Sequence, residues 1–424
     1  MSIIELGEVR DEPTVVPPVR RPRAAGRPVR SAAVLLLALV VLSGAAPFPE
    51  RTMIVVPAPR AATVYLAADS LFVVDPPIPD EDRYLTAYAE PSSSGANLRR
   101  RWQASLPRQG DYLDVRVQQR LVLVMGVSAA DGVFRTTAFD VETGQQRWQH
   151  PGAPQPIADG GLLLSDPRED GSGAISRVEP ETGRLLWSVP VPSPGENTYH
   201  GAYGRVDQFV LMQPTGEVQV YDASSGHLVR SVDTLPGDRS AYQRVQVVDD
   251  LLLLVPPGGT RLVGYGLPGL EPRWTAEVPL VSYATRCGDL LCVLPQSGGL
   301  QVLDPATGLL RWSDPTDLLA DVRGDRLLVA GTGEGYVVRD AATGQTRTEL
   351  GKWVLIPLLG RDDPLVGVRQ TADGRVVVAK LDLLSGRAQV IDVLPGLASS
   401  CQASLPVLLC QGLDGSPVLW RLRP

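Results

Sequence analysis

The chain has 424 residues, of which 44% are hydrophobic and 21% are charged, and its formal net charge is -7. This acidic balance argues against nucleic acid as the main partner, because nucleic-acid-binding surfaces are strongly basic. With 42 Gly and 38 Pro, and with no long amphipathic pattern after the first fifty residues, the composition favours many short strands joined by turns.

The first sixty residues predict a membrane anchor. Residues 1–30 are polar and rich in Pro and Arg, which predicts a disordered segment. Residues 31–48 carry no charge and are just long enough for a transmembrane helix. The arginines before this run predict a single-pass protein in the cell membrane, with a cytoplasmic N-terminus and an extracytoplasmic remainder. A signal peptide cleaved near residues 43–46 and a buried core helix are the alternatives. Residues 49–62 are typical of a linker.

One hairpin pattern then recurs along the chain. In its clearest copy, Asp304-Pro-Ala-Thr-Gly308 is followed by Arg311 and Trp312. Asp can bond its own downstream backbone, Pro presets φ, and Gly supplies a positive φ, so this segment predicts a tight turn between two strands. Eight such turns occur, and their glycines lie 36 to 49 residues apart: Gly95, Gly144, Gly183, Gly226, Gly269, Gly308, Gly344 and Gly386. Five of the turns lead to a tryptophan: Trp102, Trp148, Trp187, Trp274 and Trp312.

Short apolar runs separate these turns. Leu251–Val255 and Leu290–Leu294 are examples, and such continuous runs suit strands that are buried on both faces. The spacing leaves room for about four short strands per repeat, which is the period of a propeller blade. One blade cannot bury its faces alone, so its neighbours must cover them.

The pattern Asp-x-x-Thr/Ser-Gly-x-x-x-Trp resembles the repeat of pyrroloquinoline-quinone (PQQ)-type β-propellers, and the resemblance covers roughly residues 63–424. It implies that the hairpin joins the two outer strands of a blade and that the Trp on the outer strand locks against the adjacent blade. Three repeats lack this Trp, and Trp353 and Trp420 do not follow a motif turn. We expect those blades to dock differently.

The predicted fold is therefore all-β: a propeller of about eight four-stranded blades over residues 63–424, preceded by one transmembrane helix. Seven blades is the alternative. For ring closure we expect the last three strands of the chain to take Leu98–Ser105 as their fourth strand. The strands at Thr63–Leu66 and Leu71–Val74 would then be left as a cap or an addition to the ring. A first blade built wholly from residues 63–105 is another possibility.

The four cysteines fall into two close pairs. Cys287 and Cys292, and Cys401 and Cys410, lie around the turn between the first two strands of their repeats. In an exported domain this spacing predicts two local disulfides. Free thiols and a zinc site are less favoured, because CxxC spacing is absent and no His accompanies the pairs.

No catalytic or metal-binding set emerges from the other reactive residues. The three histidines, His150, His200 and His227, are scattered over three repeats. PQQ enzymes that the repeat resembles hold the quinone with calcium above adjacent cysteines, and this chain has no adjacent cysteines. We therefore expect no cofactor.

The function that these observations favour is a non-enzymatic, membrane-anchored scaffold. Its partner would be another envelope protein or a cell-wall component. The polar connections of unequal length are the candidate binding loops, at residues 76–84, 165–174, 192–203 and 232–242. A PQQ-dependent oxidoreductase using calcium and an extracytoplasmic sensor are the alternatives.

Overall fold

A computed structural model describes residues 53–422, apart from short gaps at 68, 79–80, 92–96, 108–109, 130, 203, 235–243, 257–258, 279, 331–334, 357–363, 396–397 and 413. The chain divides into two units, residues 1–50 and 51–424, and every described residue belongs to the second. The predicted cytoplasmic segment 1–30 and transmembrane helix 31–48 lie outside the described residues. Within the described part of the chain, no helix is long and apolar enough to cross a membrane.

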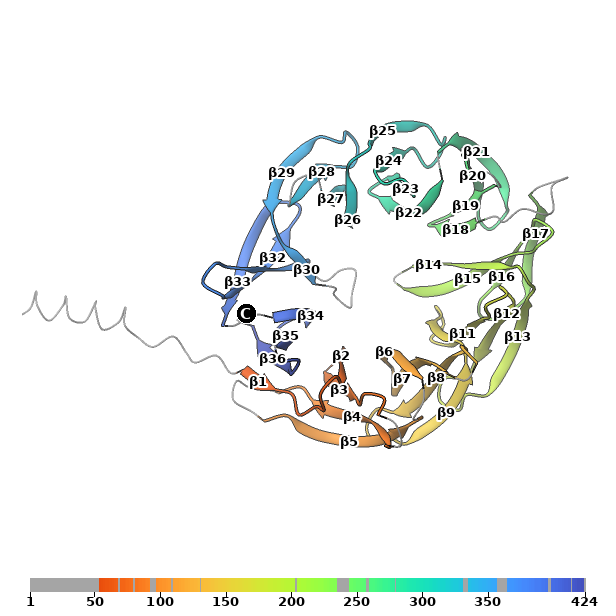
Figure 1. Cartoon of the computed structure of the whole chain (residues 1–424). Coiled ribbons are helices and arrows are strands. Elements are labelled where there is room, and N and C mark those ends of the chain that lie inside the picture. The colour runs from red at the N-terminus through yellow and green to blue at the C-terminus, as the bar shows by residue number, and fades with distance from the viewer. Residues whose placement is uncertain are drawn as a thin grey trace, which may run out of the picture. The chain divides into compact units, whose positions relative to one another are not determined.

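The described residues form nine antiparallel sheets of four strands each, arranged as the blades of a ring (Figure 1). We number the blades in chain order. Blade 1 contains β2–β5, and each later blade takes the next four strands, up to β30–β33 in blade 8. Blade 9 combines β34–β36 with β1.

Within each blade the strands run outward from the centre of the ring in a fixed order. The inner strands are β2 (Thr63–Ala67), β6 (Asp111–Gln118), β10 (Ala153–Pro156), β14 (Glu196–Ala202), β18 (Arg244–Val248), β22 (Val281–Cys287), β26 (Leu318–Arg323), β30 (Val354–Ile356) and β34 (Ala398–Ser404). The second strands are β3 (Ser70–Val74), β7 (Leu121–Val127), β11 (Leu162–Pro167), β15 (Arg205–Met212), β19 (Leu251–Val255), β23 (Leu290–Pro295), β27 (Arg326–Ala330), β31 (Val366–Gln370) and β35 (Val407–Gly412). The third strands are β4 (Arg83–Ala89), β8 (Phe134–Asp140), β12 (Gly173–Val178), β16 (Glu217–Asp222), β20 (Arg261–Gly266), β24 (Leu300–Leu303), β28 (Tyr336–Asp340), β32 (Val376–Asp382) and β36 (Pro417–Arg421). The outer strands are β5 (Arg99–Leu106), β9 (Gln146–Pro151), β13 (Leu185–Val191), β17 (Leu228–Asp233), β21 (Glu271–Glu277), β25 (Leu310–Asp314), β29 (Thr346–Gly351), β33 (Arg387–Leu394) and β1 (Met53–Val55).

Because successive strands are antiparallel, their connections alternate between the two ends of the ring. Turns between the first and second strands share one end with the recurring motif turns between the third and outer strands. Backbone hydrogen bonds join the two kinds of turn within a blade: Val141 N donates to Arg120 O at 2.9 Å, and Ala341 N donates to Asp325 O at 2.9 Å. We call this the motif end. The other end, the loop end, carries the turns between second and third strands and the connections between blades.

The prediction of eight blades is wrong, because blade 9 has no motif turn to count. Its outer strand comes from the other end of the chain: Met53 pairs with Trp420 and Val55 with Val418. The three residues of this outer strand, Met53–Val55, fall inside residues 49–62, which were expected to be a linker. The segment expected to close the ring, Leu98–Ser105, instead contributes to β5, the outer strand of blade 1. The alternative of a first blade built from residues 63–105 is the arrangement that the structure has.

Hydrophobic packing holds the ring together at the junctions between blades. The described residues contain nine apolar clusters, and each joins side chains from two neighbouring blades. One cluster joins Trp274 and Leu253 of blade 5 to Leu291 of blade 6. The cluster between blades 9 and 1 contains Leu409 and Leu71, so the junction that closes the ring is packed like the others. This arrangement explains why the second and third strands are apolar on both faces.

Glutamine side chains add polar links between some inner strands. Gln402 of β34 donates to Val64 O at 3.0 Å and accepts from Leu66 N at 3.3 Å, which ties blade 9 to blade 1. Gln246 of β18 bonds the backbone of Ala284 in β22 in the same two-sided way. These bonds satisfy backbone groups of the inner strands that no fifth strand pairs.

Candidate functional site

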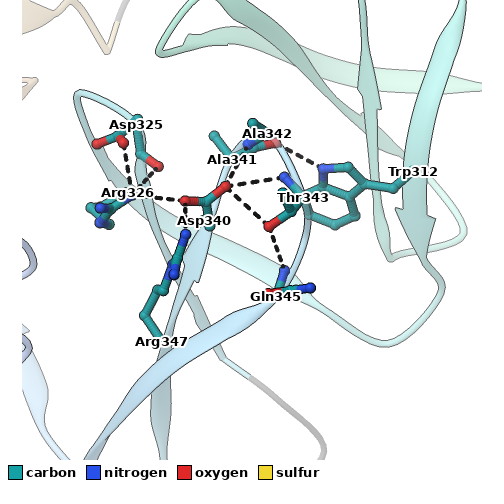
Figure 2. Close-up of polar contacts among 9 residues, drawn as sticks. All are labelled: Trp312, Asp325, Arg326, Asp340, Ala341, Ala342, Thr343, Gln345 and Arg347. Carbon is teal, nitrogen blue, oxygen red and sulfur yellow. Dashed lines mark hydrogen bonds and ion pairs between the residues drawn. The ribbon is translucent and has the colours of Figure 1, made fainter.

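The motif turns bind their own residues, as Asp340 shows (Figure 2). Its Oδ1 accepts hydrogen bonds from the backbone N–H of Ala342 at 3.2 Å and of Thr343 at 3.1 Å. Its Oδ2 accepts from Arg347 at 2.7 Å and from Arg326 at 3.0 Å. The bond from Arg347, followed by those from Thr343, lowers the pKa of the Asp340 carboxyl to about 2. A carboxylate that is already engaged on both oxygens has little capacity left for a ligand.

Five outer strands carry a tryptophan that packs over the motif turn of the next blade. Trp312 Nε1 donates to Ala341 O at 2.8 Å (Figure 2), and a Cβ on Gly344 would lie 2.8 Å from the indole. Four other junctions repeat this arrangement: Trp102 over Gly144, Trp148 over Gly183, Trp187 over Gly226 and Trp274 over Gly308. The glycine leaves room for the indole and also holds a positive φ, so these residues serve docking between blades.

The repeats without Trp dock in other ways. Thr348 lies over Gly386, in the place that an indole occupies elsewhere. In the turn of blade 5, Gly269 does not take a positive φ, and Leu270 takes it at 57° instead. The preceding outer strand, β17, has no Trp to cover this turn. Gly95 lies outside the described residues.

Both predicted disulfides are confirmed. Cys287 and Cys292 link β22 to β23 with a Cα–Cα distance of 5.8 Å, and Cys401 and Cys410 link β34 to β35 with a distance of 4.1 Å. Each bond crosses the first hairpin of its blade, and its sulfur atoms belong to the apolar cluster at a blade junction: Cys287 and Cys292 to that of blades 6 and 7, and Cys410 to that of blades 8 and 9.

The histidines stay apart from one another. His150 Nε2 lies 2.7 Å from Gly183 O, at the junction of blades 2 and 3. His200 Nδ1 lies 2.5 Å from Asp207 Oδ1 in blade 4, and His227 belongs to the motif turn of that blade. Among the described residues, no group of three or more His, Cys, Asp or Glu side chains could hold a metal ion.

A cavity of about 960 Å³ lies along the inner strands of blades 4–7, toward the motif end. Its carboxylates are paired with arginines: Arg286 lies 3.4 Å from Asp249 and 3.5 Å from Asp289, and Arg323 lies 3.0 Å from Asp321. Calcium is held by several oxygen ligands that converge on it, and no three carboxylates among the described residues of this cavity lie close enough together to hold a metal ion. The side chains of this cavity therefore do not fit that cofactor.

The loop end carries the irregular features of the ring. Three of the candidate binding loops, at 76–84, 165–174 and 232–242, connect a second to a third strand or one blade to the next, so the topology brings them to this end. The prediction of a loop at 192–203 is wrong for most of its length, because this range contains the whole inner strand β14 (Glu196–Ala202), and only residues 192–195 connect blade 3 to blade 4 at the loop end. In the one fully described loop, at 165–174, Asp170 Oδ1 accepts from Ser172 N at 2.9 Å and Ser172 Oγ at 2.6 Å. Residues 79–80, 203 and 235–242 of the other three lie outside the description.

The loop end also exposes apolar side chains that sequence reasoning missed. Leu280, Leu318 and Val354 stand at or just before the start of the inner strands of blades 6, 7 and 8, and they are 52%, 56% and 68% exposed. Tyr283 of β22, three residues after Leu280, is 48% exposed. Three successive blades thus present an apolar residue where the inner strands begin. The sequence held no signal for this, since an apolar residue at a strand start looks the same whether it faces the core or the channel.

Comparison with known proteins finds a family model that matches part of the chain and several solved structures that resemble it. The family model described as outer membrane protein assembly factor BamB matches residues 134–321, from β8 into β26. BamB from Moraxella catarrhalis is 14% identical, with 87% of this chain and 100% of that chain covered at a TM-score of 0.41. The computationally designed protein Ika8 is 17% identical, with 74% and 96% covered at a TM-score of 0.46. The C-terminal WD40 domain of Sif2 is 10% identical, with 88% and 99% covered at a TM-score of 0.46. No curated protein matches the chain.

Proposed function

Since the chain is a PQQ-like β-propeller repeat protein, we propose that it is a non-enzymatic scaffold that binds another protein of the cell envelope. In this proposal residues 31–48 hold it in the cell membrane, with the propeller outside the cytoplasm and no cofactor in the channel. The description of the matching family model, an assembly factor, supports an interaction role. The uncharged run at 31–48 and the arginines that precede it support the anchor.

The exposed apolar side chains at the loop end carry this proposal. Leu280, Leu318 and Val354 are each more than half exposed, although the apolar residues around them are buried between blades. Apolar side chains that a fold leaves uncovered at neighbouring positions favour a site of protein contact. The irregular loops at the same end supply polar groups that would surround this contact. At the motif end, in contrast, the turns contact the tryptophans of neighbouring blades.

Capture of the partner from the native cells tests the proposal. The full chain with a C-terminal tag is chemically crosslinked in intact cells and purified, and the attached protein is identified. Leu318→Asp and Val354→Asp should each reduce its recovery by roughly tenfold, because a charge in an apolar contact costs more than 1 kcal/mol. Leu384→Asp is the control, since Leu384 is 72% exposed in the motif turn of blade 8. Equal recovery with all three variants would overturn the proposed binding face, and recovery of cell-wall glycan instead of protein would overturn the proposed partner class.

A further inference from the structure

The direction of β1 fixes the end of the ring at which the chain enters it. Met53 pairs with Trp420 near the end of β36, and Val55 pairs with Val418 near its beginning. β36 runs from the loop end to the motif end, because its preceding turn joins second to third strands. β1 is antiparallel to it and so starts at the motif end. Two contacts agree: Arg421 donates to Pro91 O at 2.6 Å, and Leu422 N donates to Pro406 O at 2.7 Å, and both acceptors lie in turns of the motif end.

The tether between the anchor and β1 is short. Four residues separate the uncharged run ending at residue 48 from Met53. Five Cα–Cα steps span at most about 17 Å even when fully extended. Part of that length must cross the lipid head groups, which are roughly 5–8 Å thick on each side of the hydrocarbon core. Little chain remains for the ring to turn its other end toward the lipid.

Exposed leucines mark the same end of the ring. Apolar side chains lie in the motif turns or at the first positions of the outer strands in blades 3, 4, 6 and 8, and they are 39% to 72% exposed: Leu185, Leu186, Leu228, Val229, Leu309 and Leu384. At the loop end the exposed apolar residues of blades 6–8 belong to inner strands instead. An apolar rim around one end suits shallow contact with a lipid surface.

Part of the negative charge at the motif end is paired. The acidic residue that opens at least three of the motif turns is paired with an arginine close to the start of the following outer strand. Arg147 lies 2.7 Å from Asp140, Arg184 lies 3.4 Å from Glu179, and Arg347 lies 2.7 Å from Asp340. These pairs reduce the repulsion that free carboxylates would feel near anionic lipids.

We propose that the motif end of the propeller lies against the lipid surface and that the loop end faces away from it, toward the partner. This orientation rests on the anchor in the proposed function. It places the irregular loops and the apolar residues of the inner strands where a protein partner has free access. It also assigns the leucine rim a role in contact with lipid rather than with protein.

Site-directed fluorescence quenching tests the orientation on the full chain in liposomes. The four cysteines are all in disulfides, so a single added cysteine can be labelled selectively. Leu185→Cys and Glu169→Cys mark the motif end and the loop end of blade 3, and Leu384→Cys and Ala372→Cys mark the same ends of blade 8. All four side chains are exposed. The two ends are separated by a strand of about six residues, or roughly 20 Å, which exceeds the reach of a collisional quencher on the lipid head group.

The proposal predicts at least about twofold stronger quenching at both motif-end probes than at their loop-end counterparts, given that separation. Stronger quenching at the loop end would overturn it. Equal quenching at both ends would also overturn it, because the ring would then stand on its edge. If the chain did not float with the liposomes or were released by an alkaline wash, the anchor and this orientation would both fail. Failure of Leu318→Asp to reduce partner capture would overturn the proposed binding face and leave the quenching result intact.

Discussion

Gly308 shows how one residue serves two physical demands in a motif turn. Its φ of 70° lies in the left-handed region, and a Cβ there would stand 2.6 Å from Trp274 of the preceding blade. Side chains avoid this φ, at a cost of about 1–2 kcal/mol, and an indole cannot yield in a packed junction without further loss. The contribution of the indole contact can be separated from that of the backbone conformation, because other glycines have a positive φ without a neighbouring side chain.

We predict that Gly308→Ala destabilises the protein by at least about 1 kcal/mol more than Gly374→Ala. Gly374 has a φ of 78° but no heavy atom within 4 Å of its would-be Cβ, so it isolates the backbone cost. The midpoints of urea unfolding of the two variants give the comparison. Equal midpoints would mean that the Trp lock contributes nothing to stability.

Asp340 makes the stability of blade 7 depend on pH in the acidic range. Its folded pKa of about 2 lies below the ordinary value of 3.8, chiefly because Arg347 donates to the carboxylate. The stabilisation is therefore complete above about pH 4 and is lost as the pH falls toward 2. We predict that the midpoint of thermal unfolding of wild type falls more steeply over this window than that of Asp340→Asn. Parallel pH profiles for the two proteins would contradict this role.

At the scale of elements, the sequence predicted the interior of the ring better than its closure. The motif turns and the apolar runs carry strong local patterns, because turns need Asp and Gly and buried strands need apolar residues. The two disulfides followed from the spacing of the cysteines and the expectation of an exported domain. β1 carries no such pattern: Met53-Ile-Val55 is three residues long, has no motif turn, and pairs with residues more than 360 positions away. Pairings so distant in sequence leave no local signal, and the blade count was therefore one too low.

The prediction of the binding face from sequence was limited for the same reason, since it also depends on pairings between distant strands. Three of the loops could be singled out by length and polarity, but their common location at the loop end depends on strand direction in each blade, and the fourth range, 192–203, is mostly the strand β14. The exposure of Leu318 and Val354 depends on which strand is innermost, and that order comes from the complete sheet.

Closure by β1 should govern the stability of the ring. We predict that a chain lacking residues 1–57 unfolds at a lower temperature and aggregates more readily than a chain lacking residues 1–52, because the edge of β36 loses its partner strand. Light scattering during a thermal ramp reports both effects. Identical curves would show that blade 9 is stable with three strands.

At the scale of the whole molecule, the two ends of the ring have different roles. The motif end repeats the same turns, whose acids, glycines and tryptophans bond and pack within the protein. The loop end holds the unequal connections and the uncovered apolar residues of the inner strands. In our account the first end faces the membrane and the second end binds a protein of the envelope.

Site-specific photocrosslinking in the native cells tests this central claim most directly. A photoreactive amino acid replaces Leu318 or Val354 at the loop end, and Leu384 at the motif end in the same blade as Val354. The account predicts a discrete protein adduct from the first two positions and none from Leu384. A protein adduct from Leu384 with none from Leu318 or Val354 would contradict it.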